Sequence, residues 1–275
     1  MAKKVQKTHA VLFPFDLFGS QGSGRGVEAL HHFLKAMLAE GKNRISRASS
    51  YAKHVRISKF GFQTISAYKD WRSLGREVAR KSLCQNEFLF WVSGNHLGVL
   101  PLYDELARTR TLIIQLDAHL DVYNFGNFPK DPTSGNFLLH VKGRLPDIVS
   151  VGSREVLLKP KYAAKFFLDV YTIEDLASDF EKVIEHLLDY CARAKQVFLD
   201  IDCDVLDQAF FPAVRYPAPF GITPQQLLRI VDLTLQRNLI GVAVSEFSPT
   251  KDGDEQSIAL LGWLMKHILQ AKYEG

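Results

Sequence analysis

The chain has 275 residues, of which 47% are hydrophobic and 23% are charged, and its formal net charge is +4. This composition is typical of a folded α/β protein with a large core, and we expect a single domain spanning residues 1–275. The mild positive charge forms no basic block beyond the N-terminal stretch MAKKVQK, which we interpret as a solvated tail. We therefore predict neither nucleic acid nor a membrane as a partner.

Two further classes of protein are disfavoured. No apolar run reaches the roughly 18 residues of a membrane span, and the N-terminus lacks the long apolar core of a signal peptide. Cys84, Cys191 and Cys203 show no C-x-x-C spacing, so neither a disulfide framework nor a zinc ribbon is indicated. We expect a cytoplasmic protein.

Short apolar runs alternate along the chain with longer amphipathic runs. In chain order, this pattern predicts a strand at 9–19 running into a Gly-rich loop, a helix at 27–40, a strand at 88–96, a helix at 99–108, strands at 111–119 and 147–155, a helix at 179–194, a strand at 196–204, a helix at 223–238, a strand at 239–249 and a helix at 257–272. Residues 40–82 are polar and are predicted to hold an irregular segment and a short helix. The alternation predicts a three-layer αβα fold with a central, mostly parallel sheet.

Four predicted strands end in acids or histidines. Ligands of open parallel sheets bind outside the carboxyl ends of the strands, so these residues are candidates for a site. They are His96 in SGNH, Asp117, His119 and Asp121 in LDAHLD, Asp200, Asp202 and Asp204 in DIDCD, and Glu246 in SEF. Ionised carboxylates cannot converge in a low-dielectric site without compensation. The pattern therefore predicts a metal site.

The donor types indicate which ions would bind. The predicted ligands are His96, Asp117, His119, Asp121, Asp202 and Asp204. Their four carboxylates balance the charge of two divalent cations. Carboxylate-rich ligation with imidazoles and no thiolate favours Mn²⁺ over Zn²⁺, and a pair of such ions can activate water for hydrolysis.

The ordered stretches SGNH, DAHLD, DIDCDVLD and SEFSP resemble motifs of the ureohydrolase family, which includes arginase, agmatinase and formiminoglutamase. The family motifs are G-G-D-H, D-A-H-x-D, S-x-D-x-D-x-x-D-P and E-x-N-P, and the resemblance covers most of the chain. It implies an arginase/deacetylase-like fold. Counting from Asp202 places acids and prolines at the family positions, so the resemblance selects Asp202 and Asp204 as ligands. Asp200, where the family usually has Ser, is either a hydrogen-bond acceptor that orients a ligand or an ordinary strand-end residue.

The resemblance also implies catalytic roles. Asp121 is expected to bridge the metals, to hydrogen-bond the nucleophile and to pass its proton to the leaving amine. Glu246 resembles the family glutamate that pairs with the cationic group of the substrate. His140 lies two residues later than the family's proton-shuttle histidine, so it is either a catalytic residue or an ordinary helix histidine.

Substrate-binding residues are implied in the same way. Ser134 and Asn136, in TSGN, resemble the arginase loop that grips the substrate carboxylate. Asn124 is close to another such position, but one residue out of register. Arg215 and Tyr216 replace the family's usual Gly-Thr, which narrows the pocket and adds a cation.

Other departures concern specificity and the metal ligands. Asn95 replaces an Asp before the ligand His96, which removes a charge near the metal, and Leu157 replaces the Asp with which arginase contacts the α-amino group of its substrate. Together with Arg215, Leu157 argues against plain arginine or agmatine as the substrate. Arg215 could instead pair with Asp200 or another acid and never contact substrate.

We therefore expect a metal-dependent ureohydrolase with two divalent ions, most consistent with Mn²⁺, that cleaves a C–N bond of a small guanidino or amidino compound. One alternative is a formiminoglutamase-like hydrolase of an acidic formimino compound. Another is a catalytically silent relative that acts as a binding protein. A single-zinc deacetylase needs fewer ligands than the six present. The resemblance leaves a homo-oligomer open.

Overall fold

The computed structural model describes residues 6–62, 64–126 and 130–274. Its eight strands form one sheet in the order β2-β1-β3-β8-β7-β4-β5-β6, and every neighbouring pair is parallel. The strands are β1 (Thr8–Phe13), β2 (Val55–Lys59), β3 (Phe88–Ser93), β4 (Thr111–Leu116), β5 (Asp147–Ser153), β6 (Asp169–Thr172), β7 (Gln196–Asp202) and β8 (Leu239–Ser245).

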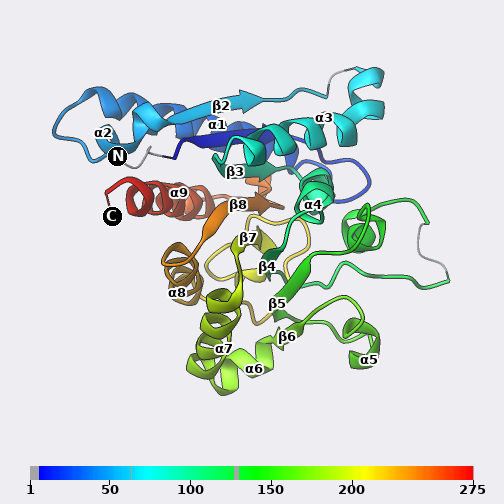
Figure 1. Ribbon diagram of the computed structural model, residues 1–275. Helices are drawn as coiled ribbons and strands as arrows, with labels where there is room; N and C mark the ends of the chain where they lie inside the picture. The colour runs from blue at the N-terminus through cyan, green and yellow to red at the C-terminus, as the bar shows by residue number, and fades with distance from the viewer. Residues whose placement is uncertain (1–5, 63, 127–129, 275) are drawn as a thin grey trace.

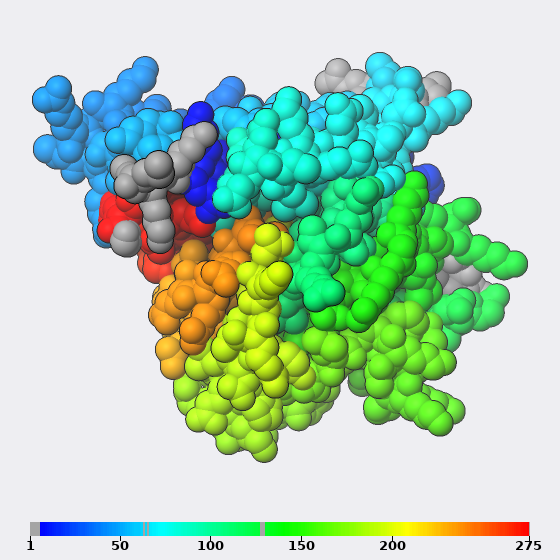
Figure 2. Space-filling view, in the orientation of Figure 1, coloured from blue at the N-terminus to red at the C-terminus, as the bar shows by residue number. Residues whose placement is uncertain are grey.

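Helices cover both faces of the sheet, which confirms the predicted three-layer fold (Figure 1). One layer holds α1 (Gly24–Ala39), α2 (Ala48–Tyr51), α6 (Ile173–Ser178), α7 (Phe180–Arg193), α8 (Pro224–Leu235) and α9 (Gln256–Glu274). The other holds α3 (Ile65–Cys84), α4 (Leu100–Leu106) and α5 (Pro160–Ala163). Figure 2 shows the C-terminal helix α9, in red, between the blue N-terminal segment and the orange α8. No helix of the described residues is long and apolar enough to cross a membrane.

Burial of the sheet on both faces explains its continuously apolar strands. In β1, Ala10 and Leu12 pack in the core under α1 and α9, whereas Val11 and Phe13 pack in the core under α3 and α4. Alternate residues of a strand point to opposite faces, so a strand covered twice needs apolar residues at successive positions.

The prediction for residues 40–82 is incomplete: this region holds the short helix α2, but also an edge strand and the 20-residue helix α3. Strand β2 pairs only with β1 and is half-buried, so it lacks the apolar run of a central strand. Helix α3 is rich in basic residues that pair with buried acids of α4: Arg72 binds Asp104, and Arg76 and Arg80 bind Glu105. These ion pairs replace part of the apolar face that would have revealed the helix. The predicted strand at 9–19 ends at Phe13, before Pro14.

At Gly26, helix α1 lies close to the segment that follows β8. A Cβ added to Gly26 would lie 2.0 Å from the carbonyl oxygen of Phe247, which immediately follows Glu246. Gly26→Ala is therefore expected to lower the free energy of unfolding by about 1–3 kcal/mol, measured by urea denaturation. Gly253→Ala is the matched control, because a Cβ there has no heavy atom within 4 Å. Equal stability of the two variants would contradict the close approach.

Candidate metal centre

The predicted ligands gather at the carboxyl edge of four adjacent strands, β3, β8, β7 and β4. His96 begins a short 3-10 turn after β3, Asp117 directly follows β4, and Glu246 directly follows β8. A cavity of about 430 Å³ opens at this edge. The predicted site residues that line it are His96, His119, Asp121, Ser134, Asp202, Asp204, Arg215, Tyr216 and Glu246.

The donor atoms form two groups that share one carboxylate. His96, Asp117 and Asp121 make the first group, and Asp117, His119 and Asp204 make the second. The shared residue is Asp117, whereas Asp121 belongs to the first group. Asp117 is fully buried. Its Oδ1 accepts from the N–H of His119, and its Oδ2 accepts from the side-chain amide of Gln115.

Distances between the side chains define the first group more closely. The Nδ1 atom of His96 lies 3.1 Å from Oδ2 of Asp117, 2.9 Å from Oδ2 of Asp121 and 3.1 Å from Oδ2 of Asp202. In the second group, Nδ1 of His119 lies 3.0 Å from Oδ2 of Asp204. Asp202 belongs to neither group, but its Oδ2 atom adjoins the first group through its contact with His96.

Backbone amides hold three of the carboxylates in place. The N–H of His119 donates to Oδ1 of Asp117 at 2.7 Å, and the N–H of Ala118 donates to Oδ1 of Asp204 at 3.1 Å. The N–H of Asp204 donates to Oδ1 of Asp202 at 3.0 Å. For Asp202 and Asp204, the Oδ2 atom that faces a histidine is not the atom that these amides bind, so each carboxylate is oriented by the fold.

The charges of the cluster fit a bound cation. Burial, followed by the charge of Asp117, raises the pKa of Asp121 to about 7, and burial raises the pKa of Glu246 to about 7. Burial opposes protonation of His119, but Asp204 and Asp117 outweigh it and raise the pKa of that ring to about 12. The carboxylates therefore draw positive charge into a buried site.

The clearest sign of a ligand is the Nδ1 atom of His96. Among the described residues, this atom has no partner in hydrogen-bond geometry, although three carboxylate oxygens lie within 3.1 Å of it. The three oxygens and the ring nitrogen therefore converge in the way that the ligands of one cation would. Carboxylates with imidazoles suit divalent ions, so the residues fit the two-metal site predicted from the sequence.

Two site residues have a left-handed backbone. The φ angle is 50° at Asp121 and 65° at Glu246, a region that non-Gly residues rarely adopt. Such conformations persist only where the surrounding structure holds them, and they often occur at functional sites. The N–H of Glu246 donates to the carbonyl of Gly94, and its Oε1 accepts from the N–H of His96 at 2.9 Å. These contacts fix the Glu246 carboxylate beside the metal ligands.

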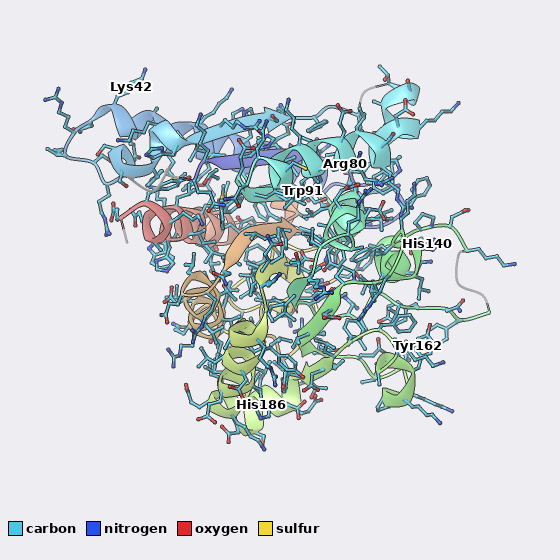
Figure 3. All side chains as sticks on the ribbon, viewed as in Figure 1. Lys42, Arg80, Trp91, His140, Tyr162 and His186 are labelled. Carbon is cyan, nitrogen blue, oxygen red and sulfur yellow. The ribbon has the colours of Figure 1, made fainter. Side chains whose placement is uncertain are left out.

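Three of the residues predicted to act in catalysis or substrate binding are not among those that line the cavity in the described structure. Asn124 is exposed, and Asn136 is buried with Oδ1 accepting from the N–H of Thr133 at 2.6 Å. Asn136 therefore shapes the loop that presents Ser134. His140, labelled in Figure 3, ends the 3-10 segment after that loop and is not among the lining residues. Its backbone carbonyl accepts from Arg72 at 2.5 Å.

The remaining departures also have structural explanations. The Asn95 amide donates to the carbonyl of Leu17 at 2.8 Å, which a carboxylate could not do, and so holds the loop after β1 against the site. That loop supplies Phe18, Gly19 and Ser20 to the cavity lining. The Gly-rich stretch in the sequence indicates this loop, but nothing in the sequence indicates that Asn95 holds it. Leu157 is 67% exposed and is not among the lining residues.

Together, the parallel sheet and the carboxylate-rich donor set define an α/β protein with a candidate metal centre at the carboxyl edge of its sheet. The chain matches the Arginase family over residues 7–270 and belongs to that family.

Individual relatives show how far the likeness extends. Formimidoylglutamase from Salmonella arizonae is 29% identical over 210 residues, which cover 70% of this chain and 64% of that protein, less than two thirds of its length. Agmatinase from Serratia proteamaculans is 25% identical over 282 residues, covering 94% of this chain and 86% of that protein. The crystal structure of arginase from Bacillus subtilis has a TM-score of 0.81 at 20% identity, with 96% and 98% of the two chains covered. At this identity, the structural likeness shows the fold.

Proposed function

We propose that the protein is a binuclear-metal hydrolase that cleaves a C–N bond of a guanidino or amidino compound. The observation that carries the proposal is the pair of donor groups that share Asp117 at a cavity also lined by Glu246. The relatives named formimidoylglutamase and agmatinase support this class of reaction. Mn²⁺ is the ion that the donor set favours, because it contains carboxylates and imidazoles but no thiolate.

The proposed chemistry divides between the ions and the chain. Divalent ions at such a site supply activation of water for nucleophilic attack near neutral pH. His96, Asp117, His119, Asp121, Asp202 and Asp204 would hold them. Asp121 lines the cavity, where its carboxylate would accept a proton and deliver it to the leaving amine. Glu246 would pair with the planar N–H groups of the substrate and orient its carbon for attack.

The lining of the cavity supports a substrate with a carboxylate. Apart from the two histidine ligands, Arg215 is the one basic side chain among the described lining residues. It is exposed and lies over the ring of Tyr216, 5.8 Å from the centroid, so it does not pair with the buried Asp200. The acids of the lining are Asp121, Asp202, Asp204 and Glu246, all in or beside the donor groups. An ammonium at the far end of the substrate would be repelled by Arg215, and the described lining offers no acid outside the metal site to bind it. A carboxylate there would instead be attracted to Arg215.

Two substrates test this preference. 4-Guanidinobutanoate and agmatine share a guanidino group but end in a carboxylate and an ammonium, respectively. With Mn²⁺-loaded protein, kcat/KM is expected to be higher for 4-guanidinobutanoate, and Arg215→Gln should raise its KM by about 5- to 10-fold without weakening the reaction of agmatine. Arg144→Gln is the control, because Arg144 is 88% exposed and does not line the cavity. An unchanged preference in Arg215→Gln would remove the proposed role of Arg215.

A formimino amino acid is the second candidate substrate, because it is acidic and because one relative is named formimidoylglutamase. A screen of guanidino and formimino compounds on Mn²⁺-loaded protein separates the two. Urea release would identify a guanidino substrate, whereas formamide or ammonia without urea would identify a formimino substrate. Absence of all three products from protein that has bound two ions would favour a catalytically silent relative.

A further inference from the structure

We propose that Asp200 is a positioning residue that fixes His96 as a metal ligand through a hydrogen-bond chain from Tyr103 to Asp200 to His96. The proposal rests on the metal site of the proposed function but is independent of the substrate. It gives a role to a buried acid that is neither a member of the donor groups nor part of the cavity lining.

The geometry of the chain is direct. Oδ2 of Asp200 lies 3.0 Å from Nε2 of His96, and the hydroxyl of Tyr103 donates to the same oxygen at 2.6 Å. Asp200 and Tyr103 are fully buried, and His96 is 1% exposed. Tyr103 comes from α4 and Asp200 from β7, so the contact joins the sheet to the helix that packs on it.

The hydrogen bond determines which ring nitrogen can bind a metal. An ionised carboxylate can only accept, so Nε2 of His96 must carry the hydrogen that it donates to Asp200. In the neutral ring, which is the form that binds a metal, Nδ1 then presents its lone pair. Nδ1 is the atom that faces Asp117, Asp121 and Asp202. A carboxylate in this position also makes the ring a stronger donor to a metal.

The charge of Asp200 argues against a merely structural role. Both donors bind Oδ2, and Oδ1 has no hydrogen-bond partner in the part of the chain that the structure describes. A buried carboxylate with so few partners is costly, and a hydroxyl side chain could satisfy Tyr103 without that cost. A cation held by His96 on the far side of the ring would offset the charge.

The sequence shows the same relocation of charge. Position 200 corresponds to Ser in the motif S-x-D-x-D-x-x-D-P, and position 95 corresponds to Asp in G-G-D-H. This chain instead has Asp200 and Asn95, and Asp200 places a carboxylate from β7 beside Nε2 of His96. Asn95 in turn is committed to the carbonyl of Leu17.

Metal titration tests the proposal without reference to any substrate. Wild type, Asp200→Ser and Asp200→Asn are titrated with Mn²⁺ while the electron paramagnetic resonance signal of free Mn²⁺ is recorded. Asp200→Asn keeps an oxygen that can accept from Nε2 and loses only the charge. The control is Asp104→Asn, because Asp104 is an equally buried acid that pairs with Arg72 and belongs to neither donor group. Circular dichroism and urea denaturation check the fold of each variant.

We expect wild type to bind two equivalents of Mn²⁺. In Asp200→Ser, one equivalent should bind about 10- to 100-fold more weakly while the other keeps its affinity. Asp200→Asn should lose less, and Asp104→Asn should lose stability but no metal affinity. If Asp200→Ser and Asp200→Asn both bind two equivalents as tightly as wild type, the positioning role is wrong, whereas wild type that binds no Mn²⁺ would contradict the proposed function itself.

Discussion

Asp117→Asn is expected to abolish two-metal binding and to lower kcat/KM by at least about 10³-fold. Asp117 is the carboxylate shared by both donor groups, so its replacement removes a charge from both at once. A metal ion at a hydrolytic site supplies several kcal/mol of transition-state stabilisation, and about 4 kcal/mol corresponds to the stated factor. The measurements are the number of Mn²⁺ ions bound per chain and kcat/KM on the substrate identified by the screen.

The fold should survive this substitution. The amide oxygen of Asn can still accept from the backbone N–H of His119, which binds Oδ1 of Asp117 at 2.7 Å. Asp147→Asn is the control, because its side chain is 54% exposed at the opposite, amino-terminal end of β5. If Asp117→Asn still bound two ions tightly, Asp117 would not be a residue that bridges the metals.

Most of the candidate metal ligands could be predicted because they follow buried strands. An apolar run such as TLIIQL is easily identified as a strand, and charged residues immediately after it must lie at the edge of the sheet. The sharing of Asp117 could not be predicted. Two-residue spacing places side chains on one side only while the chain stays extended, but β4 ends at Leu116 and Asp121 has a left-handed backbone. The relative positions of Asp117 and Asp121 are therefore set by a turn.

Residues recruited by long-range contacts were the hardest to predict. Ser20 lies near Glu246 because its loop is held by the Asn95 side chain, and no local pattern reports such a contact. The failure to predict helix α3 has the same cause, because the basic residues of α3 pack inward only by pairing with acids of α4. Asp200 illustrates the opposite case, in which the sequence left two roles open, and its contacts with His96 and Tyr103 favour the acceptor role that we propose.

Glu246→Gln should separate substrate binding from metal binding. Glu246 is buried and lines the cavity but belongs to neither donor group. The substitution keeps the shape of the side chain and an oxygen that can accept from the N–H of His96, which now binds Oε1 at 2.9 Å. It removes the negative charge that would pair with a guanidinium or amidinium. Loss of one partner of a buried ion pair costs about 3 kcal/mol or more, so kcat/KM should fall by at least about 10²-fold.

The metal content of Glu246→Gln should equal that of wild type, in contrast to Asp117→Asn. Glu105→Gln provides the matched control, because Glu105 is an equally buried glutamate that binds Arg76 and Arg80 of α3 and lies outside the cavity lining. It should lower the urea midpoint and leave kcat/KM unchanged. If Glu246→Gln instead lost an equivalent of Mn²⁺, Glu246 would be part of the metal site, and the cationic group of the substrate would need another partner. If Glu246→Gln kept both the metals and the activity, the charge of Glu246 would not contribute to the reaction. The left-handed backbone at Glu246 would then have a structural role.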